Sequence, residues 1–435
     1  MRQRFTYFIL LFVLLNGIST NADAQFWKRL FGGKEKKRID RGERIYKSDR
    51  TNTKANTKPV PVVKKKVDPT YPTTVFKERY RIDVFVALYL NELVKDDKPT
   101  FKGKIPDKAV GGLDFYKGVK LATDSLNKQG YTFDVFLHDV TDSSESAAVL
   151  IKDNTLDSTD LIIAAVGSSY LPALSDFSKK HQINFVSALS PSDAGIKNNP
   201  FFIMQLPSLA SNCEWIMAAM VKKYPKVKPL VLYRKSVVVD SNALAYLNVS
   251  NTPANMLSCS TMPTKEVLRS FLDSSKLNVL VVPVVDAAYA ESILLKLSEY
   301  FPKYNFEVYG MPTWKSMPVL KKPDAIPNIG VNLTMPFYFD QSLPNEAAVS
   351  NSYKKENGTA PSEMAFRGYE TLTWYSYLLH KYGTVFNTHI SDNSSAPFIH
   401  YDIKNRFDKK EDFLYLENKH LFLIRYQSSS YIIEQ

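Results

Sequence analysis

The chain has 435 residues, of which 44% are hydrophobic and 13% aromatic, so it is long enough to bury two domain-sized cores. Its formal net charge is +12, but residues 25–80 alone carry 17 Lys and Arg against 6 Asp and Glu. Residues 81–435 are therefore close to neutral. This distribution argues against nucleic-acid binding by the folded part, because nucleic-acid-binding domains concentrate positive charge on their folded surface.

The first 24 residues have the three parts of a secretory signal peptide. The basic start MRQRF precedes a short apolar run, and Ala22-Asp23-Ala24 fits a small-residue cleavage site. The run is too short to favour a membrane-spanning helix, and no cysteine follows it for lipid attachment. We expect cleavage after Ala24 and export to the periplasm, with at most a peripheral association with the envelope.

A basic tether is expected over residues 25–78. The stretch is rich in Lys, Arg, Thr, Asn and Pro, and it has few large apolar residues after Phe31. Such a composition cannot bury enough apolar surface to fold, so it predicts a disordered, partly extended segment. Its positive charge could contact an anionic membrane surface or the cell wall.

From Arg81 onward, apolar runs with the length of strands alternate with amphipathic helical patterns. The expected strands of the first half cover residues 81–90, 131–140, 161–167 and 183–189, and the expected helices cover 112–130, 144–156 and 171–182. Near-continuous apolar strands that alternate with helices predict a parallel sheet with helices on both faces.

The same alternation begins again near residue 209. Expected helices cover residues 211–228, 241–248, 265–275 and 288–301, and expected strands cover 229–234, 255–262, 278–285 and 306–311. Two more helices follow, at 345–358 and 362–383, and the C-terminal end has the pattern of a β-hairpin with its turn at 427–430. The sequence thus predicts an α/β protein of two Rossmann-like lobes.

Several phrases, in order, resemble the type I periplasmic binding protein family, the branched-chain amino acid receptor or ANF-receptor-like group. They are FYKGVKLATDSLNKQG, VFLHDVTDS, DLIIAAVGSSYLPALSDFSKKHQINFVSALS, VYGMPTWKSM and AFRGYETLTWYSYLLHKYG. The chain looks most like ABC-transporter substrate-binding proteins of Bacteroidetes-type bacteria. The resemblance implies two lobes joined by a hinge: first lobe 79–207, second lobe 208–335, return segment 336–400, and a C-terminal hairpin near the hinge at 401–435.

Candidate ligand-binding residues follow the expected strands of the first lobe. Ligands of open α/β sheets bind beyond the carboxyl ends of the strands, and Gly167, Ser168 and Ser169 begin a helix there. Glycine permits a tight turn, and a helix N-terminus offers hydroxyls and free N–H groups to an anion. The resemblance implies that this turn receives the carboxylate of an amino-acid-like ligand. Ser187 and Ser190 leave the next strand toward the same crevice; helix capping and turn formation are their alternative roles.

The second lobe departs from the family pattern. Its first strand ends in Tyr233 and is not followed by the Tyr-Gly pair that is usual in the family. A later strand ends in Asp286, at a position where family members commonly have a small polar residue. Tyr233 and Asp286 could complete a ligand site, with Asp286 binding an ammonium group or capping its helix. Family members can also keep the fold and lose the small ligand.

The remaining reactive residues give no sign of catalysis. Ser168 is followed by Ser169 and Tyr170, where a nucleophile elbow needs a small residue, and only His138 among the six histidines is placed to face the crevice. No metal-ligand cluster or phosphate-binding loop is present in the sequence, so neither metal nor cofactor is expected. Cys213 and Cys259 could form one disulfide or remain two separate buried thiols.

Three functions remain open on the sequence. The first is a non-enzymatic exported receptor that binds a small amino-acid-like or peptide-like ligand between its lobes, with an ABC permease as a partner. The second is a ligand-free envelope scaffold of the same fold, resembling the activators of peptidoglycan synthases, with an envelope protein as its partner. A serine hydrolase is the least favoured of the three. The sequence names neither the ligand nor the oligomeric state.

Overall fold

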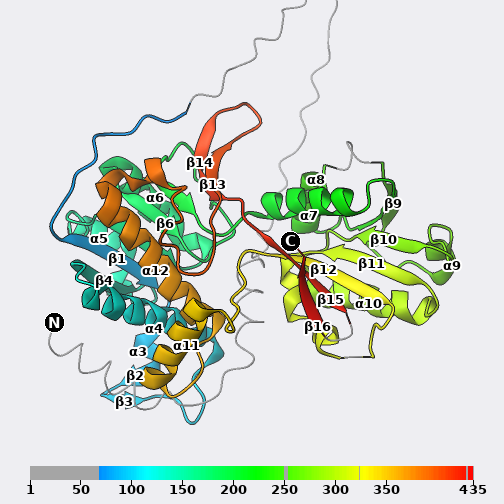
Figure 1. The fold of residues 1–435 in the computed structure, drawn as a ribbon, viewed down its shortest axis with the longest axis horizontal. Coiled ribbons are helices and arrows are strands. Elements are labelled where there is room, and N and C mark those ends of the chain that lie inside the picture. Colours follow the sequence, from blue (N-terminus) through cyan, green and yellow to red (C-terminus); the bar gives the residue numbers. More distant parts are fainter. Residues whose placement is uncertain (1–67, 249–252, 323, 428–429, 435) are drawn as a thin grey trace, which may run out of the picture.

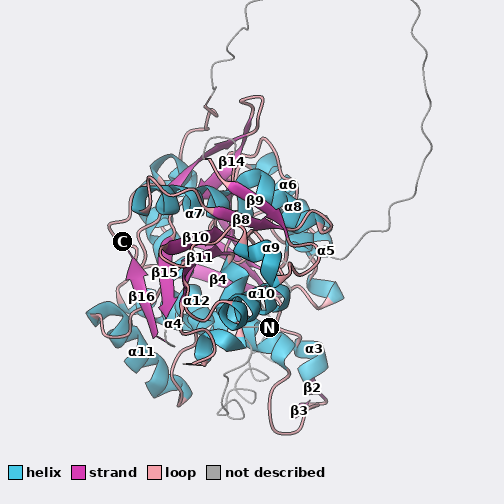
Figure 2. Ribbon diagram, turned by 90° about the vertical axis from the view of Figure 1, so that its right-hand side faces the viewer, coloured by secondary structure: helices cyan, strands magenta, loops and turns pink. Residues whose placement is uncertain are grey.

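The computed structural model describes residues 68–248, 253–322, 324–427 and 430–434, which form two α/β lobes side by side (Figure 1). The predicted signal peptide and nearly all of the predicted tether therefore lie outside the described residues. Each lobe has one seven-stranded sheet, and the two sheets have different strand orders. Helices cover the sheets of both lobes (Figure 2).

The first lobe is built on the sheet β13-β14-β7-β6-β5-β1-β4. Its strands are β1 (Tyr80–Val86), β4 (Phe133–Asp139), β5 (Leu161–Ala165), β6 (Asn184–Ser187), β7 (Phe202–Met204), β13 (Ile403–Phe407) and β14 (Phe413–Asn418). All neighbours pair in parallel except β13 with β14. The sequence predicted the five-residue apolar strand β5 because such a run must be buried on both faces. It did not predict β7 or β13.

Two cores sandwich this sheet. The helices of the lobe are α3 (Leu90–Leu93), α4 (Asp107–Lys128), α5 (Ala147–Lys152), α6 (Leu171–His181), α11 (Pro344–Asn357) and α12 (Glu363–Tyr382). Strands β2 (Val94–Lys95) and β3 (Lys98–Pro99) form a separate two-stranded antiparallel sheet. Val84 and Val86 of β1 face the core shared with α4 and α12, whereas Phe85 faces the core shared with α5 and α6. This alternation is the period of two expected for a strand that is buried on both faces.

The helices α4 and α12 touch at two glycines, Gly118 and Gly368. This contact explains the glycine in each of the two family-like phrases FYKGVKLATDSLNKQG and AFRGYETLTWYSYLLHKYG. A Cβ atom on Gly118 would lie 1.9 Å from the carbonyl oxygen of Ala365, and one on Gly368 would lie 2.0 Å from that of Phe115. Each helix therefore brings a glycine against the backbone of the other, and any larger residue would push them apart.

The second lobe is built on the sheet β16-β15-β12-β11-β10-β8-β9. Its strands are β8 (Leu230–Tyr233), β9 (Asn255–Ser258), β10 (Leu277–Val281), β11 (Asn305–Gly310), β12 (Ile329–Met335), β15 (Phe422–Gln427) and β16 (Ser430–Glu434). Its helices are α7 (Leu209–Lys223), α8 (Val238–Tyr246), α9 (Lys265–Arg269) and α10 (Ala287–Tyr300). Strands β8 to β12 are parallel, and β15 and β16 add an antiparallel edge.

Buried groups hold the core of the second lobe together. Trp314 folds its indole over Gly310, where a Cβ atom would lie 2.2 Å from the ring, and its Nε1 donates to the carbonyl of Val284 at 2.7 Å. Cys213 and Cys259 are both buried and unbonded, which is the second of the two alternatives left open by the sequence. Burial raises the pKa of Cys259 to about 11, so its thiol stays protonated.

The chain crosses between the lobes three times, at 205–208, 336–343 and 419–421 (Figure 1). The third crossing corrects one expectation. Residues 401–435 are not a single hairpin near the hinge: β13 and β14 extend the sheet of the first lobe, and β15 and β16 extend that of the second. The predicted hairpin of β15 with β16 is present and pairs Gln427 with Ser430, whereas residues 428–429 of its predicted turn lie outside the described residues.

Glu417 ties the first crossing to the third. Its carboxylate accepts from the backbone N–H of Ser208 at 2.9 Å and from the hydroxyl of Ser211 at 2.6 Å, and it pairs with Lys419 at 2.7 Å. Burial opposes its ionisation, but Lys419 and the serine donors hold the pKa of Glu417 below its ordinary value. The carboxylate thus fixes the N-terminus of α7 against the last crossing.

The last residues of the expected tether dock on the first lobe. Thr74 donates from its hydroxyl to the carbonyl of Tyr382 at 2.7 Å, and Lys77 pairs with Asp160 at 2.6 Å. Gly383 has a φ of +73°, and a Cβ atom there would lie 2.5 Å from the hydroxyl of Thr74. The last residues of the expected tether, 68–78, therefore belong to the first lobe instead. Among the described helices, none is both long and apolar enough to cross a membrane.

Candidate functional site

The exit of β5 presents open polar groups, as the sequence predicted. Gly167 is followed by the 3₁₀ turn η2 (Ser168–Tyr170), which leads into α6 with a proline in its first turn. Ser168 is half-buried and Ser169 is exposed. Within the described part of the chain, neither serine hydroxyl has a hydrogen-bond partner. Free hydroxyls at the start of a helix are suited to an anionic or polar ligand group.

Gly167 does not have the conformational role that the sequence suggested. Its φ is −69°, an ordinary value for any residue, and a Cβ atom would have nothing within 4 Å. The turn is therefore not tight in a way that requires glycine. What the position offers is open space next to the serine turn.

Ser187 and Ser190 lie beneath the surface. Ser187 is fully buried, and its hydroxyl has no hydrogen-bond partner among the described residues. The hydroxyl of Ser190 closes a turn: it donates to the carbonyl of Ser192 at 3.0 Å and accepts from the N–H of the same residue at 3.2 Å. In this conformation both serines support the wall of the first lobe rather than present donors at its surface.

Tyr89 is a feature of this wall that sequence reasoning missed. It follows β1 in the left-handed region, with a φ of 59°, which is a strained conformation for a bulky residue. The carboxylate of Asp139 accepts from the N–H groups of Leu88 and Leu90, both at 2.9 Å, and so holds the backbone on either side. Burial raises the pKa of Tyr170, and the charges of Tyr89 and Asp139 raise it further.

On the second lobe, Tyr233 and Asp286 are already engaged. Tyr233 is half-buried, and the Lys235 ammonium lies 5.4 Å from the centre of its ring. Asp286 accepts from the N–H groups of Ala288 and Tyr289, both at 3.1 Å, so it caps α10. Capping is the more ordinary of its two predicted roles.

Arg234 organises this wall from within. Its guanidinium pairs with the fully buried Asp240 at 2.6 Å and lies 4.5 Å from the centre of the Tyr289 ring. Asp240 also accepts from the N–H of Val285 at 2.8 Å. The charges of the second wall are therefore satisfied by one another, whereas the serine turn of the first wall is not.

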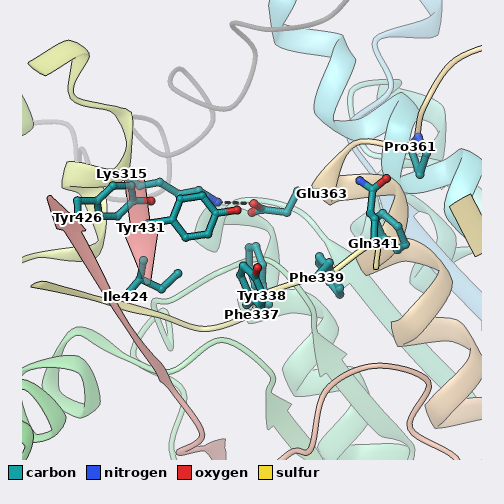
Figure 3. A pocket seen from close by; sticks show the side chains of 11 residues that line it. Lys315, Phe337, Tyr338, Phe339, Gln341, Pro361, Glu363, Ile424, Tyr426 and Tyr431 are labelled. Atoms are coloured by element: carbon teal, nitrogen blue, oxygen red, sulfur yellow. Dashed lines mark hydrogen bonds and ion pairs between the residues drawn. The ribbon is translucent and has the colours of Figure 1, made fainter. Parts of the chain in front are cut away.

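The structure also has a pocket between the lobes that none of the predicted residues lines (Figure 3). Its volume is about 230 Å³. It is lined by residues of the 3₁₀ turn η4 (Pro312–Ser316), the second crossing, the start of α12, and strands β15 and β16: Lys315, Phe337, Tyr338, Phe339, Gln341, Pro361, Glu363, Phe366, Ile424, Tyr426 and Tyr431. The aromatic run after β12 was the signal in the sequence that could have revealed it.

One ion pair spans this pocket from lobe to lobe. Lys315 follows β11 in the second lobe, and Glu363 is the first residue of α12 in the first lobe (Figure 3). Their side chains are 29% and 18% exposed, so the ion pair is only partly open to solvent at the pocket. Tyr338 of the second crossing bonds to Tyr431 of β16, and burial together with this bond raises the pKa of Tyr338 to about 12.

Among the described residues, no base bonds to a hydroxyl of the serine turn. His138 is buried, stacks on Phe85 with ring centres 4.7 Å apart, and bonds to Asp83 at 2.7 Å. It is a structural histidine of the first lobe. Over the described ranges, no group of His, Cys, Asp and Glu side chains could hold a metal ion.

No known protein family's sequence profile matches the chain, and no curated protein sequence matches it either. Several solved structures, in contrast, are similar to the chain in fold. A branched-chain amino acid ABC transporter protein from Rhodospirillum rubrum is 13% identical, with a TM-score of 0.58 over 82% of this chain and 99% of that one. A periplasmic ligand-binding protein of a branched-chain amino acid ABC transporter from Burkholderia xenovorans is 14% identical, with a TM-score of 0.55 over 82% and 94%.

Full-length LpoA from Haemophilus influenzae is also similar, at 13% identity and a TM-score of 0.52, over 84% of this chain but only 60% of that one. At such identities the likeness concerns the fold. The predicted fold class, two α/β lobes joined by a hinge, is confirmed: the chain has the type I periplasmic binding protein fold.

Proposed function

We propose that this protein is a non-enzymatic exported solute-binding protein that closes two lobes on a small amino-acid-like ligand. The observation that supports the proposal most is the pocket to which both lobes and one crossing contribute walls. A ligand bound there contacts both lobes at once, so binding and lobe movement are coupled. Two of the structural neighbours are named for branched-chain amino acid transport, which favours an amino acid as the ligand.

The size of the pocket separates the two ligand classes left open by the sequence. Sites for drug-sized ligands occupy roughly 300–1,000 Å³. The interlobe pocket, at about 230 Å³, is smaller and is matched to a single amino acid rather than to a peptide. The open serine turn at Ser168 and Ser169 is a second group of donors for the same class of ligand.

A hydrolase is not supported. A serine nucleophile needs a base within hydrogen-bond reach, and the one histidine expected near the crevice, His138, is committed to Asp83. The partners that fit the proposal are a small polar ligand and an ABC permease. Export through residues 1–24, and contact of the basic tail with an anionic surface, belong to the same proposal.

Isothermal titration calorimetry of the mature chain with the twenty free amino acids and a set of dipeptides tests this function. We expect at least one free amino acid to bind and the dipeptides to bind more weakly. Thermal melting with the same panel is the parallel measurement, because a ligand that binds only the folded state raises the Tm. Absence of binding by every compound would contradict the proposal.

A ligand-free envelope scaffold is the second candidate, and one observation favours it. The second-lobe wall near Arg234 has its charges paired internally, so it offers little to a small ligand. The likeness to LpoA is compatible with it. Co-sedimentation with purified peptidoglycan tests this candidate: the full mature chain should pellet, and a chain without residues 25–67 should not. Equal pelleting of both chains would show that the basic tail does not make the contact, and no pelleting of the full mature chain would contradict the candidate.

A further inference from the structure

The pocket between the lobes carries two opposite charges that come from different lobes. Glu363 stands at the first position of α12, a helix of 20 residues whose N-cap is Ser362. The first turn of a helix favours negative charge, so Glu363 stands where a carboxylate is stabilised. Lys315 approaches it from the second lobe. The two groups are the only Lys, Arg, Asp or Glu residues among those that line the pocket.

The rest of the lining is mostly aromatic. Six of the eleven lining residues are Phe or Tyr, and only Ile424 is a branched aliphatic residue. Phe339 stacks on Phe366 with ring centres 5.0 Å apart, and Tyr338 meets Tyr431 edge to face at 6.1 Å. Tyr431 is 52% exposed, so part of the aromatic surface stays open. Aromatic walls gain most from another ring, through offset or edge-to-face contacts.

We propose that this pocket binds the zwitterion of a free aromatic amino acid. The ligand's ammonium group pairs with Glu363, its carboxylate pairs with Lys315, and its ring lies among the rings of the lining. This inference rests on the proposed function and specifies its ligand. Without ligand, Lys315 and Glu363 pair with each other. A zwitterion that enters between them replaces this one ion pair by two, one with Lys315 and one with Glu363.

The same geometry excludes related compounds. A ligand without its ammonium group leaves the carboxylate of Glu363 facing a neutral group. A ligand without its carboxylate leaves the ammonium of Lys315 facing a neutral group. Leaving one member of a partly buried charge pair without its partner is costly. A branched-chain amino acid keeps both charges but loses the ring contacts. Both charges and the ring are therefore required for full affinity.

Calorimetry of the mature chain with five compounds tests the inference: L-phenylalanine, L-tyrosine, L-leucine, N-acetyl-L-phenylalanine and L-phenylalaninamide. We expect L-phenylalanine or L-tyrosine to bind best. Each blocked derivative should bind at least roughly ten-fold more weakly, because it lacks one charge-assisted contact. Binding of either blocked derivative within about three-fold of L-phenylalanine would overturn the inference.

Variants then locate the site. Lys315→Gln and Glu363→Gln should each weaken binding of the preferred amino acid at least roughly ten-fold. Lys296→Gln is the matched control, because Lys296 forms a comparable pair with Glu299 on the surface of α10, and it should leave binding unchanged. Circular dichroism melts check that each variant folds.

The outcomes distinguish this inference from the function on which it rests. If an amino acid binds, and Ser169→Ala weakens it while Lys315→Gln and Glu363→Gln do not, the solute-binding function stands and the inference is wrong. If L-leucine binds tightly and the aromatic amino acids do not, the ligand class is wrong. If no amino acid binds, both proposals are contradicted.

Discussion

The strand exits of the two lobes, called here the first and second walls, satisfy their polar groups in different ways. In the first lobe, the exit of β5 leaves the hydroxyls of Ser168 and Ser169 open toward solvent. In the second lobe, the exits of β8 and β10 are joined by Arg234 and Asp240, and Asp286 caps its own helix. Among the described residues, the two serine hydroxyls of the first wall have no hydrogen-bond partner, whereas the charges of the second wall are paired within the protein.

The difference follows from the cost of burying charge. A half-exposed serine needs no partner in the protein because water can supply one. The hydroxyls of the first wall can therefore stay without a protein partner at little cost in stability. Arg234 and Asp240 are 8% and 0% exposed, and ions that deep must be paired within the protein. A binding surface of the second lobe must therefore use other residues, and Lys315 of the interlobe pocket is one that remains accessible.

The largest effect is expected for the second wall. Asp240→Ala removes the partner of a buried guanidinium and the acceptor of the Val285 N–H, so it should lower the free energy of unfolding by about 3–5 kcal/mol. Urea unfolding followed by tryptophan fluorescence measures this. Asp240→Asn retains an acceptor for the N–H and should cost less. A loss below about 1 kcal/mol would show that the network does not hold the wall together.

In the first lobe, the scaffold under the open wall should be sensitive where α4 and α12 touch. Gly368→Ala places a methyl group 2.0 Å from the carbonyl oxygen of Phe115 and should destabilise the protein by about 3 kcal/mol. Gly167→Ala is the matched control, because a Cβ atom there meets nothing within 4 Å, and it should be neutral or slightly stabilising. Equal effects in the two variants would contradict the helix contact.

A pH dependence is expected from the buried core behind the first wall. Burial, only partly offset by nearby Arg367, raises the pKa of Glu370 from 4.5 to about 7. Between these values the folded protein holds a proton that the unfolded chain releases, so stability falls as the pH rises through that window.

Glu370→Gln should remove this dependence, because the amide does not ionise and can still accept from the N–H of Ile399. Relative to this variant, the wild type should lose about 3 kcal/mol between pH 4.5 and pH 7.5. Urea unfolding at both pH values measures the difference. A difference that does not change with pH would show that Glu370 has an ordinary pKa.

Asp286 distinguishes capping from ligand binding on the second wall. Asp286→Ala should cost about 1 kcal/mol of stability through loss of the helix cap, whereas Asp286→Asn should keep the cap. Both variants should bind the preferred amino acid like the wild type. Weaker binding by Asp286→Asn, measured by calorimetry, would show that the carboxylate contacts the ligand.

The smallest effect on stability is expected at the serine turn. Ser169→Ala removes an exposed hydroxyl with no hydrogen-bond partner among the described residues, so the free energy of unfolding should change by less than about 0.5 kcal/mol. If the turn contacts the ligand, the same variant should weaken binding several-fold. An unchanged affinity would leave the pocket around Lys315 and Glu363 as the site.

Much of the fold could be predicted because each lobe repeats one local pattern. The run LIIAA is apolar at every position, which only a strand covered on both faces accommodates, and it is β5. Strand β7 is apolar but only three residues long, strand β13 is mostly polar, and their place is set by pairing with β6 and β14. Strand pairing between distant residues leaves no signal in a single sequence.

The sequence by itself determined the two-lobe α/β architecture and the serine turn after β5, because periodicity and helix starts are local properties of the chain. Tertiary structure decided which polar groups are open. Arg234 and Asp240 are six positions apart with nothing in the sequence to join them, and Lys315 meets Glu363 across 48 positions. Which charges find partners depends on how the lobes and their crossings pack, and that packing gives the pocket between the lobes its aromatic walls and its single ion pair.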